Sequence, residues 1–150
     1  MVRIIAIDPS GTGTTGICLI NGKEIEFKEC KEKDWRKHYD FITALVKTFK
    51  PSLLLFENTN FINSRNRDSL NLIRLLGALE CLSIKQVDSI NVLKVKELSK
   101  LLLKGQVKIA DLEYLVGRGK GWMWKGERIV VHQLEAYLVY WLWKKSSTSA

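Results

Sequence analysis

The chain has 150 residues, of which 46% are hydrophobic, and its 24 lysines and arginines outnumber 16 aspartates and glutamates for a net charge of +8. This length fits one domain, and the charge favours a polyanionic partner such as nucleic acid. No apolar run approaches the roughly 18–20 residues of a membrane span, and the chain enters a strand too early for a signal peptide. The three widely spaced cysteines form no CxxC pair, which indicates reduced thiols and disfavours zinc. We therefore expect a cytoplasmic protein without a membrane partner.

Apolar runs and turn signals predict three strands and one helix in the first third of the chain. The first strand covers residues 2–8 and the second covers 15–21. An Asn-Gly pair, a strong hairpin signal, separates the second strand from an exposed third strand over 24–30. Asp34 is suited to cap a helix over 35–49 whose apolar residues share one face.

The middle of the chain alternates strand and helix patterns. A buried strand over 52–57 precedes a helix over 68–83, and a further strand follows over 86–90. This succession predicts an α/β protein with a five-stranded mixed sheet flanked by helices. We expect the strand order 3-2-1-4-5, with strand 3 antiparallel at the edge, in a single domain over 1–145.

The last third of the chain reads as helical. Residues 92–103 and 107–116 show two short helical patterns, and a flexible basic loop over 117–121 follows them. Residues 130–143 form the pattern of a final amphipathic helix. The polar residues 146–150 are expected to be a disordered tail.

The predicted strand order brings two acids together. Asp8 ends the first strand and Glu57 ends the fourth, and the carboxyl ends of such strands are where open α/β sheets bind ligands. Burying an unpaired carboxylate is costly, and a metal ion would compensate its charge. His132 and Glu135 share one face of the final helix through their i, i+3 spacing. If this face meets the acids, the four groups suit Mg²⁺, with Mn²⁺ as a substitute.

Each of these features alone has a structural explanation. Asp8 fits a turn, Glu57 fits a solvated strand end, and His132 with Glu135 fits the polar stripe of an amphipathic helix. No single structural need produces all three in one basic chain. The combination therefore favours a metal-dependent nuclease.

Three motifs carry a resemblance to a known family. Residues 7–16, Ile-Asp-Pro-Ser-Gly-Thr-Gly-Thr-Thr-Gly, resemble the first motif of the RuvC family of Holliday-junction resolvases, within the ribonuclease H-like superfamily. Residues 55–57 resemble the segment with the family's second acid, and residues 132–136, His-Gln-Leu-Glu-Ala, resemble its C-terminal helix motif. The resemblance covers roughly residues 3–143.

Two positions depart from the family pattern. Ser10 stands where the family commonly has Gly, and Glu135 stands where it usually has Asp, which moves the carboxylate outward by one methylene. Such variation is similar to the phage-encoded branch of the family. The resemblance implies a Mg²⁺-dependent homodimer that cuts four-way DNA junctions at two symmetric phosphodiesters. It also implies that Asp8, Glu57, His132 and Glu135 are the metal-binding and catalytic residues.

The predicted DNA contacts are basic residues and one aromatic residue. The family carries basic residues behind its active site and inserts an aromatic residue from the loop after its second acid. The candidates at matching or neighbouring positions are Lys96, Lys108, Arg65, Arg67, Phe61 and Arg118. The helix over 68–83 has more apolar residues than one buried face needs, so the surplus either packs against the sheet alone or also forms a two-fold interface, and the resemblance favours the dimer.

Several alternatives stay open at this point. A ribonuclease H-type enzyme, or a broader nuclease of forks and flaps, would use the same metal chemistry. An inactive DNA-binding relative would keep the sheet, although the intact acids at 8, 57 and 135 argue against it. An actin-like ATPase shares the Gly/Ser/Thr hairpin, but that fold needs a second such domain.

Overall fold

The structure is a computed structural model that describes residues 2–58 and 66–148. A central sheet is made of β1 Arg3–Asp8, β2 Thr14–Asn21, β3 Glu24–Lys31, β4 Leu53–Asn58 and β5 Gln86–Asn91. The sheet order is β3-β2-β1-β4-β5, which confirms the prediction. β1, β4 and β5 are parallel, whereas β2 and β3 pair antiparallel as a hairpin at the edge.

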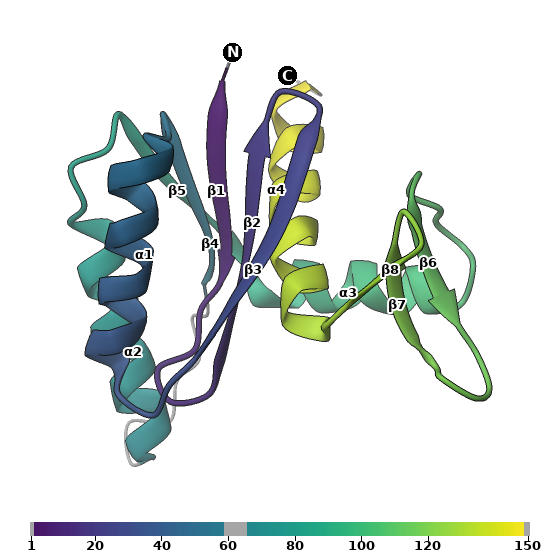
Figure 1. The fold of residues 1–150 in the computed structure, drawn as a ribbon, viewed down its shortest axis with the longest axis horizontal. Helices are drawn as coiled ribbons and strands as arrows, with labels where there is room; N and C mark the ends of the chain where they lie inside the picture. The colour runs from purple at the N-terminus through teal and green to yellow at the C-terminus, as the bar shows by residue number, and fades with distance from the viewer. Residues whose placement is uncertain (1, 59–65, 149–150) are drawn as a thin grey trace.

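Helices cover both faces of this sheet (Figure 1). α1 Trp35–Phe49 and α2 Arg67–Glu80 pack on one face, and α3 Val92–Leu103 and α4 Val131–Thr148 lie on the other. The side chain of Asp34 accepts a hydrogen bond from the Arg36 backbone N–H, as predicted for the cap of α1. Among the described residues, no helix combines the length and the apolar composition that a membrane span requires.

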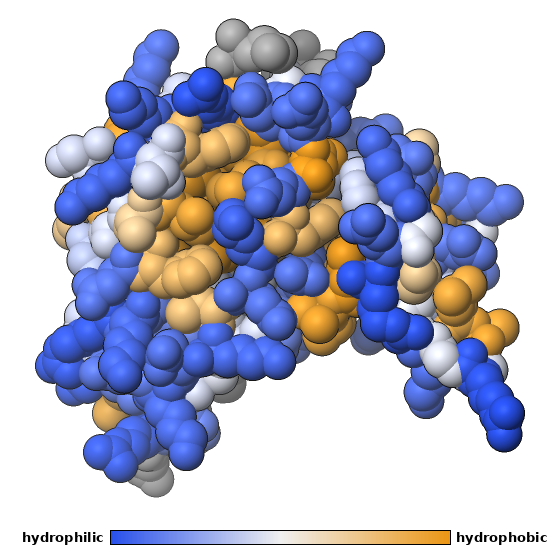
Figure 2. Space-filling view, in the orientation of Figure 1, coloured by the Kyte–Doolittle hydropathy of each residue, from blue (hydrophilic) through white to orange (hydrophobic). Residues whose placement is uncertain are grey.

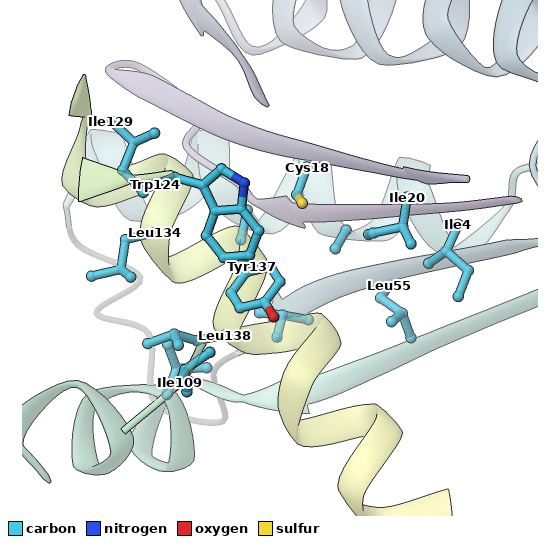
Figure 3. Packing of buried hydrophobic residues seen from close by; sticks show 14 of the residues in the cluster. Ile4, Cys18, Ile20, Leu55, Ile109, Trp124, Ile129, Leu134, Tyr137 and Leu138 are labelled. Atoms are coloured by element: carbon cyan, nitrogen blue, oxygen red, sulfur yellow. The ribbon is translucent and has the colours of Figure 1, made fainter. Parts of the chain in front are cut away.

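The strands alternate between two cores because successive side chains point to opposite faces. In β1, Ile5 and Ile7 face α1 and α2, whereas Ile4 and Ala6 face α4. The core beside α4 also contains the aromatic residues Trp124 and Tyr137, whose ring centroids are 4.7 Å apart (Figure 3). This alternation decides which face of the sheet the polar residues at the strand ends occupy.

The prediction of a helix over 107–116 is wrong, because a second sheet occupies this region. β6 Leu112–Leu115, β7 Gly121–Trp124 and β8 Glu127–Ile129 form an antiparallel three-stranded sheet beside the main body (Figure 1). Leu112 and Tyr114 pack toward the core with an acidic residue between them, which is the alternation of a strand. Lys125 and Gly126 both have positive φ, 49° and 81°, and make the tight turn between β7 and β8.

The remaining differences concern the ends of elements. Residue 121, predicted to end a basic loop, is the first residue of β7. The final helix continues through Thr148, so residues 146–148 of the predicted disordered tail are helical, and 149–150 lie outside the described residues. The assignment of 1–145 to a single domain stays a prediction.

Candidate active site

Two carboxylates lie side by side on the α4 face of the sheet. In β1, Asp8 continues the series Ile4 and Ala6 that faces α4, and in β4, Glu57 continues the series of Leu55. The parallel register of the two strands places both acids at their carboxyl ends. Asp8 is only 7% exposed, so its charge is largely removed from water.

The first turn of α4 brings two more groups to this point. His132 Nδ1 lies 3.0 Å from Asp8 Oδ2, a contact between residues 124 positions apart in the chain. One ligand atom each from Asp8, His132 and Glu135 lies within 4.8 Å of the others. The predicted helix-borne pair therefore meets the strand-borne acids.

A glycine in β2 permits this meeting. Gly16 lies beside Asp8 in the antiparallel ladder, and the backbone of α4 passes directly over it. A Cβ on Gly16 would collide with the backbone carbonyl of His132, and would lie 2.6 Å from the backbone nitrogen of Gln133. The absence of a side chain at position 16 thus sets how closely the first turn of α4 approaches the sheet.

The electrostatics of Glu57 show how crowded the site is. Burial raises the pKa of Glu57 to about 9, and the neighbouring carboxylates of Asp8 and Glu135 act in the same direction. Lys96 of α3 opposes this shift, which places its ammonium near the acids. Glu57 Oε2 is buried and has no hydrogen-bond partner among the described residues. A buried carboxylate oxygen without a partner is costly, and coordination to a cation would compensate it.

The two groups on α4 respond to the same surroundings. Burial raises the pKa of Glu135 to about 7, and the charge of Asp8 adds to the effect while His132 and Lys96 oppose it. The hydrogen bond to Asp8 raises the pKa of His132, since the imidazolium donates to a carboxylate. Three carboxylates and an imidazole in one place are hard, mostly oxygen ligands, which fit Mg²⁺ or Mn²⁺.

A buried histidine, His38, stabilises the turn after Asp8 through hydrogen bonds. The sequence patterns did not single it out. His38 is fully buried in α1, with Nδ1 2.8 Å from Thr15 Oγ1 and Nε2 2.7 Å from the Glu32 carbonyl oxygen. Thr15 Oγ1 in turn accepts a hydrogen bond of 3.0 Å from the Ser10 backbone N–H. This chain of contacts fixes the turn that begins directly after the acid.

A further acid beside the site was also missed. Glu29 of β3 pairs with Gly16 and, following Phe27 by two residues, lies on the α4 face. Its charge contributes to the raised pKa of His132, and its Oε2 is buried without a hydrogen-bond partner among the residues described. The Asn-Gly turn between β2 and β3 could have revealed this acid, because counting outward from the turn along both strands pairs Glu29 with Gly16.

The predicted DNA contacts occupy different places. Lys96 lies by the acids, as described above, whereas Lys108 lines a separate groove beside α4. Arg67 is the first residue of α2 and lines a cavity on the opposite side of the sheet. Arg118 lies in the connection between β6 and β7. Phe61 and Arg65 lie outside the described residues.

The first prediction concerns Gly16. Gly16→Ala should lower the affinity for Mn²⁺ at least tenfold, because the new methyl group pushes His132 and Glu135 away from Asp8. Isothermal titration calorimetry measures the affinity. Gly77→Ala is the matched control, because a Cβ there meets nothing within 4 Å, and it should bind Mn²⁺ normally. Unchanged binding by Gly16→Ala would show that the first turn of α4 does not hold the metal.

The second prediction concerns pH. The folded-state pKa values of Glu57 and Glu135 lie above their usual 4.5, so the metal-free protein should lose stability as pH rises from about 5 through 7 and toward 9. Mn²⁺ binds the deprotonated groups and should therefore raise Tm more at pH 8.5 than at pH 5.5. In metal-free buffer at pH 8.5, Glu57→Gln should melt at least a few degrees above the parent protein. Melting curves that do not depend on pH or metal would contradict this account.

Comparisons with known proteins bear on the fold. No protein-family model matches the chain, and no curated protein matches it in sequence. The structure of RuvC from T. thermophilus in complex with a Holliday junction substrate aligns with a TM-score of 0.55 at 14% identity, over 93% of this chain and 90% of that chain. The yeast mitochondrial Holliday junction resolvase Ydc2 aligns with a TM-score of 0.48 at 13% identity, over 70% of this chain and 62% of that chain. YeaZ from Pseudomonas aeruginosa aligns with a TM-score of 0.46 at 12% identity, over 87% of this chain and 65% of that chain. Because the RuvC alignment spans nearly all of both chains, we conclude that the protein has a RuvC-like fold of the ribonuclease H-like type.

Proposed function

We propose that this protein is a metal-dependent endonuclease that cuts branched DNA, with Mg²⁺ as its cofactor and Mn²⁺ as a substitute. The convergence of Asp8, Glu57, His132 and Glu135 carries the proposal, because three separate elements deliver these groups to one point. Structural need does not explain two partly buried glutamates, Glu57 and Glu135, whose pKa values are both raised by burial and by the charge of Asp8. The net charge of +8 supplies attraction for the phosphate backbone.

The residues of the site have distinct roles in this proposal. Asp8, Glu57 and Glu135 would hold the divalent ion, which when bound neutralises phosphate charge and makes water a better nucleophile. When His132 is neutral and its Nδ1–H donates a hydrogen bond to Asp8, its Nε2 carries no proton and can accept one. His132 is therefore suited to accept a proton from an attacking water. Asp8 fixes the tautomer and the ring orientation for that step.

For the substrate, we propose a four-way junction cut at two symmetric phosphodiesters. The aligned RuvC structure is a complex with a Holliday junction substrate, and the similarity of fold supports extending that substrate to this chain. Lys96 beside the acids offers one phosphate contact, and Arg67 at the start of α2, on the other face of the sheet, offers a second. The alternative is a nuclease of forks and flaps or a ribonuclease H-type enzyme, which would need the same four residues.

Two symmetric cuts require two active sites, and we propose that α2 supplies the interface of a homodimer. Leu75, Leu76 and Leu79 of this helix are buried against the sheet. On its outer side, Leu70 and Ile73 are 38% and 41% exposed. These two partly exposed apolar side chains fit a self-complementary contact between two copies.

The third prediction concerns Asp8. Asp8→Asn should abolish cleavage of a synthetic four-way junction with Mg²⁺, while binding of the junction is kept or tightened because a negative charge near phosphate is lost. A gel that compares junctions, forks, flaps and RNA–DNA hybrids measures cleavage and separates the proposed substrate from its alternatives. Asp40→Asn, an exposed change on α1, is the control and should cut normally. Wild-type cleavage by Asp8→Asn would refute the site.

The fourth prediction concerns the pair on α4. His132→Ala should reduce turnover at least a hundredfold with little change in Tm, since its side chain is 43% exposed and packs little. Glu135→Asp should keep measurable activity and favour Mn²⁺ over Mg²⁺, because Mg²⁺ tolerates less geometric error. Cleavage rates in each metal, beside a thermal melt, test both. The exposed Glu97→Asp is the control for the shortened side chain. A His132→Ala protein that melts far lower but cuts normally when folded would show that the histidine is structural.

The fifth prediction concerns the dimer. Ile73→Arg should convert the protein to a monomer in sedimentation velocity, because it places a charge at the centre of the proposed contact. The monomer should still bind Mn²⁺ but should lose the paired cutting of a junction. Leu93→Arg is the control, since Leu93 is 70% exposed on α3, and should leave the dimer intact. A wild-type protein that sediments as a monomer with and without junction DNA would exclude this arrangement.

A further inference from the structure

A second feature of α4 lies on its outer side, away from the acids. A groove of about 540 Å³ runs along this helix, between the β2–β3 turn on one side and the small sheet on the other. Apolar side chains are visible between the main body and the small sheet, bordered by hydrophilic ones (Figure 2). None of the groups that form the candidate active site lines this groove.

The groove is strongly basic. Its lining includes five lysines and a single acid, Asp111. Three of the lysines come from outside α4: Lys23 from the β2–β3 turn, Lys108 from the segment after α3, and Lys125 from the β7–β8 turn. In the described part of the chain, these three form no salt bridge. Lysines from three separate segments that converge without matching acids create a local positive potential.

Aromatic rings line the same groove. Trp124 and Tyr137 are nearly buried, whereas Tyr140 and Trp141 are half-buried and line its wall. The Nζ of Lys145 lies 4.9 Å from the centroid of the Trp141 ring. A similar pair places Lys144 Nζ 6.0 Å from the Tyr140 ring. Partly exposed rings and ammonium groups therefore lie next to each other in the groove.

The groove and the active site lie on different sides of α4. Tyr137, Tyr140, Trp141 and Lys144 follow the i, i+3, i+4, i+7 spacing of one helical stripe. His132 and Glu135 belong to the stripe that faces Asp8. At about 3.6 residues per turn, these two stripes lie on nearly opposite sides of the helix. A ligand in the groove would therefore be distinct from a phosphate held at the acids.

We propose that this groove is a second binding site for a single DNA strand. Aromatic side chains stack on unpaired bases of any sequence, and lysines contact the phosphates between them. A duplex hides its base faces, so a groove that combines half-buried rings with lysines favours a strand with unpaired bases. The proposal does not depend on the nuclease function, because it uses none of the metal-binding residues. Near a branch point, such a site would hold a strand that has left the duplex.

Charge reversal tests the phosphate contacts. The double variant Lys23→Glu/Lys125→Glu should bind a fluorescein-labelled thymidine 15-mer at least tenfold more weakly in EDTA, measured by anisotropy. The slope of log binding constant against log salt concentration should become shallower by about 1.4, since each of the two lost phosphate contacts to a single strand contributes roughly 0.7. The matched control is Lys47→Glu/Lys85→Glu, an equal charge change at exposed positions outside the groove. Equal weakening by both variants would attribute binding to net charge and overturn the proposal.

Substitution of Trp141 tests the stacking. Trp141→Leu keeps an apolar side chain for folding, and should weaken binding of the 15-mer about tenfold while Tm changes little. The proposal is overturned if the wild-type protein does not bind the 15-mer, or if Trp141→Leu binds it normally. It is also overturned if the groove variants change the sedimentation coefficient, because the groove would then contact a second copy of the chain. Retained junction cleavage by Asp8→Asn, with unchanged 15-mer binding, would contradict the proposed function and leave the groove proposal intact.

Discussion

The contact between the first turn of α4 and β2 at Gly16 is the constraint on which the candidate site depends. Asp8 and Glu57 reach their places through the parallel register of β1 and β4. His132 and Glu135 reach theirs only if the helix backbone lies directly on the sheet. A side chain at position 16 would prevent that approach. One missing methyl group in β2 thus links two parts of the site that are more than a hundred residues apart in sequence.

The site concentrates like charges, and that arrangement has a cost in the absence of a cation. Glu57 and Glu135 are held where ionisation is unfavourable, and one Glu57 oxygen has no partner among the residues described. Such a cluster destabilises the metal-free fold at neutral and alkaline pH. Structural acids are more often paired with lysine or arginine, and among the described residues only Lys96 acts in that sense on Glu57. The imbalance is what supports a functional assignment for these residues.

Local patterns in the sequence were enough to predict the central sheet and to single out the four residues that the structure brings together at the candidate site. The Asn-Gly turn fixed the β2–β3 hairpin, and buried runs ending in Asp8 and Glu57 fixed β1 and β4. The small sheet was missed because its strands are short, and a four-residue apolar pattern in β6 fits a helix equally well. His38 was missed because its partners, a threonine hydroxyl and a backbone carbonyl, become neighbours only after α1 packs. Such contacts between distant segments leave no periodic trace in the sequence.

The connection between the small sheet and α4 has a mechanical consequence. β8 ends at Ile129 and α4 begins at Val131, so one residue, Val130, joins the two elements. The N–H of Val130 is held by the side chain of Gln133, and its carbonyl accepts the first hydrogen bond of the helix from Leu134. The junction is one residue long, and His132 is the second residue of the helix that follows it. A displacement of β8 would therefore also shift the first turn of α4, which carries His132, the imidazole that is suited to accept a proton.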